Sequence, residues 1–168
     1  MKPFLILSLP RSGTAWLANW LTQSGVYCYH ELFAELGVTS VQGVASRLGE
    51  DSNLVLGNSD SGNIWYVEQL RKLLPDVTMV TVTRSVEDVY RSSAQALVNA
   101  TLCDDNMLQA VWGHLVETSA LLSRVTKEYG LQEESFDELF TLPVELSAAA
   151  GRRIWGAVSG GLPFDEER

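Results

Sequence analysis

The sequence predicts an α/β protein of three layers, in which a central parallel sheet of four or five strands is flanked by helices. Short apolar runs typical of buried strands alternate along the chain with longer segments whose apolar residues recur at helical spacing. The clearest strand, 77–83, is β-branched almost throughout, as expected of a strand covered on both faces. This alternation indicates parallel strands that are joined by helical crossovers.

The first half of the chain is expected to contain three strands and three helices. In order, these are strand 4–9, helix 14–22, strand 26–29, helix 40–48, strand 53–56 and helix 64–74. Pro10 ends the first strand, and Gly25 separates the first helix from the second strand. The polar stretch 57–62 stops the third strand. The helix 64–74 has its apolar residues on one face and is followed by Pro75.

The second half is expected to complete the sheet and its helical cover. In order, its elements are strand 77–83, helix 86–98, helix 106–128, edge strand 133–136, helix 144–150 and a loop-like acidic tail 160–168. Arg84 closes the strand 77–83. Trp112 lies among apolar residues at helical spacing on the long helix, so we expect it in the core. No repeat, low-complexity tract or Pro/Ser-rich linker divides the chain, which predicts a single domain over 1–168.

The composition narrows the classes of function. With 168 residues, 46% of them hydrophobic and 20% charged, the chain can bury a core of its own. A net charge of −9 argues against a nucleic-acid surface. No apolar run approaches the ~20 residues that cross a bilayer, and no leader peptide is evident, so we expect a cytoplasmic protein without membrane partners. Cys28 and Cys103 lack metal or redox spacing and are expected to be free thiols.

The parts of an anion cradle combine in the turn after the first strand, which reads Arg11-Ser12-Gly13-Thr14-Ala15-Trp16. The first backbone N–H groups of the following helix have no intrahelical partner and lie at the positive end of its dipole. Gly13 allows close approach of a ligand, and Arg11 adds a charged, forked donor. The alternative is an ordinary turn in which Ser12 or Thr14 caps the helix. The Gly-x4-Gly-Lys-Ser/Thr string of common ATPases and GTPases is absent.

Several polar segments follow strands and should meet at the carboxyl edge of the sheet. They are Arg11, Glu31, the stretch 58–62 and Arg84. Ligands of open parallel sheets bind beyond this edge. Arg84 could instead pair at the surface with Glu87 or Asp88, a contact worth at most ~1 kcal/mol. The convergence of four segments on one edge favours a ligand site.

These motifs resemble those of the sulfotransferases that use 3′-phosphoadenosine-5′-phosphosulfate (PAPS). The segment 9–17 resembles the loop that holds the 5′-phosphosulfate, and Arg84 with Ser92, eight residues later, resembles the pair that grips the 3′-phosphate. The resemblance implies a P-loop-like sulfotransferase fold, PAPS as the donor and no metal. The donor-binding residues that it implies are Arg11, Ser12, Gly13, Thr14, Ala15, Trp16, Arg84 and Ser92. Trp16 would stack near the adenine or else pack in the core.

One carboxylate is expected to act as the general base. Residues 25–33, which include His30 and Glu31, resemble the segment that supplies a catalytic glutamate in trehalose and tyrosylprotein sulfotransferases. Glu31 is therefore expected to take the acceptor proton while Arg11 stabilises charge on the departing nucleotide. The alternative for Glu31 is a dipole contact with the following helix. His30 is the second choice of base, because strand alternation turns its side chain to the opposite face, and Asp60 is the third, with a loop cap as its alternative.

Three departures from the family pattern bear on activity. Ser59 stands where many members carry a lysine, and Ala15 replaces a frequent threonine or serine. The C-terminal Arg-Lys-Gly loop of the cytosolic enzymes has no clear counterpart. Arg152-Arg153 is a conceivable substitute, with surface charge as the alternative.

The sequence therefore predicts a sulfotransferase that moves the sulfuryl group of PAPS to a hydroxyl or amine of a small-molecule, glycan or peptide acceptor. One alternative is a catalytically weakened nucleotide-binding protein on the same scaffold, and a less favoured one is a small ATP-dependent kinase. The acceptor pocket is expected to be lined by 27–36 and 40–51. A homodimer could form through apolar surface on the long helix.

Overall fold

Five strands form a parallel sheet in the computed structural model, which describes residues 1–35, 40–100, 104–140 and 144–165. The strands are β1 (Phe4–Ser8), β2 (Val26–His30), β3 (Val55–Ser59), β4 (Thr78–Thr83) and β5 (Gln132–Ser135). Their order is β2-β3-β1-β4-β5, and every neighbouring pair is parallel. The predicted α/β class with a parallel sheet of four or five strands is confirmed.

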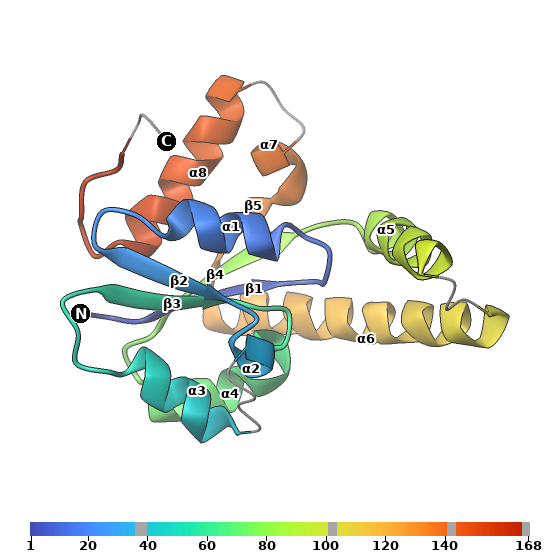
Figure 1. The fold of residues 1–168 in the computed structure, drawn as a ribbon, viewed down its shortest axis with the longest axis horizontal. Coiled ribbons are helices and arrows are strands. Elements are labelled where there is room, and N and C mark those ends of the chain that lie inside the picture. The colour runs from blue at the N-terminus through green and yellow to red at the C-terminus, as the bar shows by residue number, and fades with distance from the viewer. Residues whose placement is uncertain (36–39, 101–103, 141–143, 166–168) are drawn as a thin grey trace.

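Helices cover both faces of this sheet. They are α1 (Thr14–Leu21), α2 (Leu32–Glu35), α3 (Val41–Leu48), α4 (Asn63–Leu73), α5 (Val86–Asn99), α6 (Asp105–Tyr129), α7 (Phe136–Phe140) and α8 (Val144–Val158). In Figure 1, α1, α7 and α8 lie on one face, α3, α4 and α6 lie on the other, and α5 extends past the carboxyl edge of the sheet. None of the described helices is both long enough and apolar enough to cross a membrane.

Side-chain alternation along β1 divides the core into two clusters. Phe4 and Ile6 pack in the cluster that α1 and α8 complete, whereas Leu5 and Leu7 pack in the cluster beneath α3, α4 and α6. All four side chains are fully buried. β1 is therefore covered on both faces, and burial of this kind holds the strand ends at the carboxyl edge in fixed positions.

β3 runs to Ser59 and does not stop before Gly57 as expected. Gly57 lies opposite Phe4 in the parallel register with β1, and the Phe4 ring fills the space that a side chain at Gly57 would need. The next residue, Asn58, is polar but finds hydrogen-bond partners inside the protein. The start of the polar stretch therefore continues the strand, because Phe4 packs against Gly57 and Asn63 pairs with Asn58.

The helices differ from expectation in three respects. α8 continues beyond 150 to Val158, and Ile154 and Trp155 in this extension are buried. The short helices α2 and α7 span too few residues to produce a periodic signal in the sequence. Trp112, expected in the core, is 39% exposed and meets Tyr90 of α5 edge to face, because the first turns of α6 project beyond the sheet (Figure 1).

Cys28 is a buried free thiol, as expected. Burial raises its pKa far above the usual range, so the thiol stays neutral and unreactive. Cys103 lies outside the described residues.

Two glycine substitutions test this packing. Gly57→Ala places a methyl group against the Phe4 ring and should lower the free energy of unfolding by about 1–3 kcal/mol, the usual cost of overpacking. Gly113→Ala, in α6 with no atom near the added methyl, should instead raise it by up to ~1 kcal/mol through helix propensity. Urea unfolding measures the change in the free energy of unfolding for each variant. Equal changes in the two variants would contradict the close packing of Gly57 against Phe4.

Candidate functional site

The loop between β1 and α1 is shaped as a cradle with no side chain capping the helix. Gly13 is the N-cap residue of α1, has a left-handed backbone (φ 75°) and brings no side-chain hydrogen bond to the first turn. Arg11 is left-handed as well (φ 61°), which is uncommon for a residue other than glycine. Because neither Ser12 nor Thr14 caps α1, the first N–H groups of the helix remain available to an anion.

Buried polar atoms without partners gather around this loop. Among the described residues, six buried side-chain nitrogen or oxygen atoms have no hydrogen-bond partner, and four of the six belong to Ser8, Ser12, Ser59 and Asp60. Ser8 and Ser59 end the neighbouring strands β1 and β3, Ser12 lies in the cradle, and Asp60 follows β3 directly. Buried polar groups are rarely left unsatisfied, so this cluster indicates a place where a polar ligand completes the hydrogen bonds.

The structure brings together Arg11, Arg84 and Ser92, three of the eight residues that the family resemblance assigns to donor binding. The Arg11 side chain donates from Nε to Ser92 Oγ at 3.3 Å, and the Arg84 guanidinium donates to the backbone carbonyl of Arg11. Arg11 therefore lies between Arg84 of the β4 end and Ser92 of α5. The predicted grouping of strand end, loop and helix is present at one position.

Neither Arg11 nor Arg84 forms an ion pair with a carboxylate of the described residues, whereas Arg47, Arg91 and Arg153 each do. The surface pairing of Arg84 with Glu87 or Asp88 is therefore not seen, and Asp88 instead pairs with Arg91. In a chain of net charge −9, two guanidinium groups at one loop without carboxylate partners make a local positive site.

Aromatic side chains cover one side of the cradle. The guanidinium carbon of Arg84 lies 4.1 Å from the ring centroid of Phe136, a cation–π contact. The ring of Phe140 lies so close to Gly13 that an added Cβ would come within 2.5 Å of it. Trp16 stacks on Trp20 at 5.6 Å and meets Phe140 edge-on, yet is 44% exposed. Its expected alternative, packing in the core, is therefore wrong, and its ring forms part of the exposed wall of the cradle.

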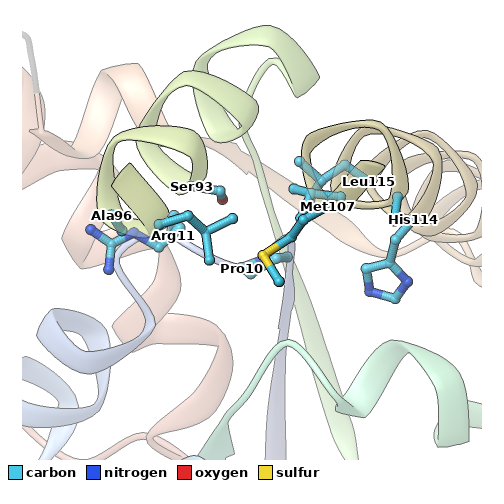
Figure 2. Close-up of a pocket in the computed structure, with 10 residues that line it drawn as sticks. Pro10, Arg11, Ser93, Ala96, Met107, His114 and Leu115 are labelled. Carbon is cyan, nitrogen blue, oxygen red and sulfur yellow. The ribbon is translucent and has the colours of Figure 1, made fainter. Parts of the chain in front are cut away.

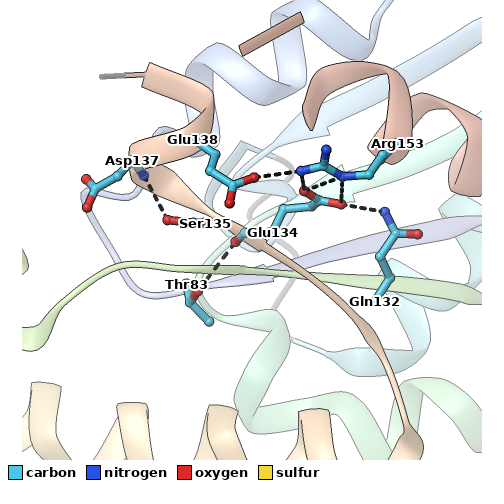
Figure 3. A network of polar contacts seen from close by, with 7 residues as sticks. All are labelled: Thr83, Gln132, Glu134, Ser135, Asp137, Glu138 and Arg153. Carbon is cyan, nitrogen blue, oxygen red and sulfur yellow. Dashed lines mark hydrogen bonds and ion pairs between the residues drawn. The ribbon is translucent and has the colours of Figure 1, made fainter. Parts of the chain in front are cut away.

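An ion pair between a half-exposed arginine and a buried carboxylate holds this aromatic segment in place. Glu134 of β5 is 3% exposed and accepts a forked pair of hydrogen bonds from Arg153 of α8, which also pairs with Glu138 of α7 (Figure 3). The hydrogen bonds that Arg153 donates to Glu134, and then the one it donates to Glu138, raise the pKa of Arg153 above its usual range. Arg153 thus fixes α7, and with it Phe136 and Phe140, and it is committed to these carboxylates.

His30 and Glu31 lie beside the cradle at the end of β2. His30 Nε2 is 3.2 Å from Thr14 Oγ1 and 3.6 Å from Glu31 Oε1. The expected opposite orientation of the two side chains is wrong, because Glu31 leaves the strand with a left-handed backbone (φ 55°) and the alternation ends there. Glu31 is half exposed, and the four-residue helix α2 offers little dipole for it to stabilise.

Two buried asparagines fix the strand ends beneath these residues. The Asn58 side chain accepts from the backbone N–H of Leu32 and donates to Asn63 Oδ1, while Asn63 Nδ2 donates to the carbonyls of Ile6 and Asn58. The ends of β1, β2 and β3 are therefore joined through one pair of amides. This pair sets the position of Glu31, which precedes Leu32.

Asp60 is 5% exposed and caps its own loop by accepting from the N–H of Gly62 at 2.7 Å, as its alternative role predicted. Its second oxygen has no partner. Ser59, which stands at the position expected for lysine, is also buried. The described ranges contain no group of three or more His, Cys, Asp or Glu side chains arranged to hold a metal ion.

Sequence reasoning missed the roles of Asn58 with Asn63, of Phe136 with Phe140, and of Ser8. An asparagine spaced five residues from another gives no recognisable motif, and the contacts of Phe136 with Arg84 and of Phe140 with Gly13 join segments that are distant in the sequence. Ser8 carried one available signal, since a serine inside an otherwise apolar buried strand requires a hydrogen-bond partner.

The sequence matches no family model and no curated protein. Among solved structures, a sulfotransferase from Alicyclobacillus acidocaldarius is similar with a TM-score of 0.69 and 14% identity, covering 99% of this chain and 87% of that one. A gluconokinase from Sinorhizobium meliloti 1021 gives a TM-score of 0.55 and 13% identity over 91% of this chain and 93% of that one. A shikimate kinase from Bacteroides thetaiotaomicron gives a TM-score of 0.52 and 12% identity over 92% of this chain and 96% of that one. At these identities the similarity shows the fold, a P-loop-like α/β architecture found in a sulfotransferase and in small kinases.

Proposed function

We propose that this protein is a sulfotransferase that takes the sulfuryl group of PAPS and transfers it to a hydroxyl or amine. The observation that carries the proposal is the joining of Arg11, Arg84 and Ser92 at an uncapped helix N-terminus, with both guanidinium groups free of carboxylate partners among the described residues. Similarity to the fold of a sulfotransferase supports it.

The residues present fit a donor with two separate phosphate groups. Arg84 and Ser92 would hold the 3′-phosphate, and the amides from Ser12 to Thr14 together with Arg11 would hold the 5′-phosphosulfate. The unpartnered hydroxyls of Ser8 and Ser12 supply further donors close to the cradle. PAPS supplies an activated sulfuryl group, which the chain itself does not contain.

Positioning and charge stabilisation would account for most of the catalysis. In transfer, the acceptor oxygen or nitrogen bonds to sulfur while the bond from sulfur to the bridging oxygen breaks, and that oxygen leaves on adenosine 3′,5′-bisphosphate. Arg11 would stabilise the charge that develops on the leaving group. Glu31 would take the acceptor proton, and His30, hydrogen-bonded to Thr14 of the cradle, would hold the Glu31 carboxylate toward the site.

A second candidate is phosphoryl transfer from ATP. The folds of a gluconokinase and a shikimate kinase are similar, and Asp60 offers a buried carboxylate oxygen without a partner at the end of β3. The cradle has no lysine at the positions where the common ATP-binding string places one. This absence favours PAPS over ATP.

Removal of the Arg84 side chain tests donor binding. Titration calorimetry with adenosine 3′,5′-bisphosphate, without magnesium, should show binding to the unmodified protein and at least about tenfold weaker binding to Arg84→Ala, because a charge-assisted contact is lost. Arg91→Ala is the matched control, since Arg91 is an exposed arginine of α5 that pairs with Asp88. Equal losses in the two variants, or no binding to the unmodified protein, would contradict the proposal.

Substitution of Glu31 tests the base. Glu31→Gln should lower the rate of radiolabelled sulfate transfer from PAPS by about 10²–10⁴-fold, the usual contribution of a general base, with bisphosphate affinity nearly unchanged. Glu31→Asn should lose transfer equally but raise the melting temperature by about 2–4 °C, because asparagine tolerates the left-handed backbone better. Unchanged turnover in Glu31→Gln, with turnover lost in His30→Gln, would assign the base to His30.

A further inference from the structure

A pocket of about 560 Å³ opens beside the cradle, between α5 and α6. Its lining comes from the cradle loop, α5 and α6, and includes Pro10, Arg11, Ser93, Met107, Ala110 and His114. Figure 2 shows Met107 and His114 on α6 at one side, Ser93 on α5 at the other and Pro10 between them, with the Arg11 side chain below α5 on the side away from His114. Its volume lies within the range of about 300–1,000 Å³ that is typical of small-molecule sites.

The lining specifies the chemistry of an occupant. Arg11 supplies the single charged side chain, Ser93 and His114 supply the polar ones, and the remaining lining side chains are apolar. The His114 ring is held flat against Trp65 of α4, with ring centroids 5.6 Å apart. A sugar bound here would find few hydrogen-bond partners for its hydroxyls, because most of the lining is apolar. A flat or branched apolar body with one polar end satisfies the lining.

The pocket and the cradle share Arg11, and Ser93 follows Ser92 directly on α5. We infer that this pocket binds the acceptor, an uncharged and largely apolar molecule that carries one hydroxyl or amine and directs that group toward Arg11. The inference rests on the proposed function. The acceptor site would then lie between α5 and α6, and not along 27–36 and 40–51 as the sequence predicted.

The test measures the binding of an apolar, acceptor-like probe separately from the binding of the donor nucleotide. Fluorescence titration with 2-naphthylmethanol, an uncharged apolar probe with one hydroxyl, should show saturable binding in the absence of nucleotide. D-glucose at the same concentrations should not compete. Ala110→Phe places a ring in the pocket and should weaken binding of the probe at least about tenfold. Ala120→Phe, the same change at an exposed position of α6 outside the pocket lining, should leave the affinity unchanged.

Titration of the same variants with adenosine 3′,5′-bisphosphate distinguishes failure of the inferred acceptor pocket from failure of the proposed function. Retention of bisphosphate binding in Ala110→Phe, with loss of the naphthyl probe, supports the acceptor pocket and shows that the variant is folded. Naphthyl binding that is absent from the unmodified protein, equal in Ala110→Phe, or displaced by glucose would overturn the inference while leaving the donor site standing. Naphthyl binding without any bisphosphate binding would overturn the proposed function and leave an apolar pocket.

Discussion

The buried amide pair of Asn58 and Asn63 holds the carboxyl edge of the sheet together. Both side chains are fully buried, and between them they bind the backbone at the ends of β1, β2 and β3. A buried polar group costs free energy unless it is satisfied, so this network is stable only when all three strand ends are correctly placed. The same condition positions the cradle after β1 and Glu31 after β2.

In this acidic protein, the fold places two positively charged side chains together at the cradle. Arg11 and Arg84 are held by a backbone carbonyl, a serine hydroxyl and an aromatic ring, none of which neutralises a guanidinium. In the described ranges, three residues other than glycine have left-handed backbones. Two of them are Arg11, in the cradle, and Glu31, beside it. Strain of this kind persists where the surroundings impose it and is common at functional sites.

The parts of the site that were predicted from the sequence are those with local causes. An apolar strand followed by Pro10 and Gly13 specifies the β1 turn, and the β-branched strand before Arg84 specifies the position of that arginine. The end of β3 could not be predicted, because Gly57 and Asn58 fit a strand only through contacts with Phe4 and Asn63. The positions of Phe136 and Phe140 at the cradle also depend on non-local packing, since α7 is placed by the pairing of Arg153 with Glu138 and with Glu134 of the preceding strand. The His30 and Glu31 orientation depended on one backbone angle that residue patterns do not encode.

The proposed function requires the cradle and Arg84 to select a nucleotide with a 3′-phosphate, and direct competition between two nucleotides tests this selection. Adenosine 3′,5′-bisphosphate without magnesium and ATP with magnesium would be titrated against the same preparation, and each would then be added to the complex of the other. We expect that the bisphosphate binds without metal and that ATP with magnesium, which has no 3′-phosphate for Arg84, does not displace it. Tight binding of ATP that requires magnesium and excludes the bisphosphate would rule out this selection and favour phosphoryl transfer.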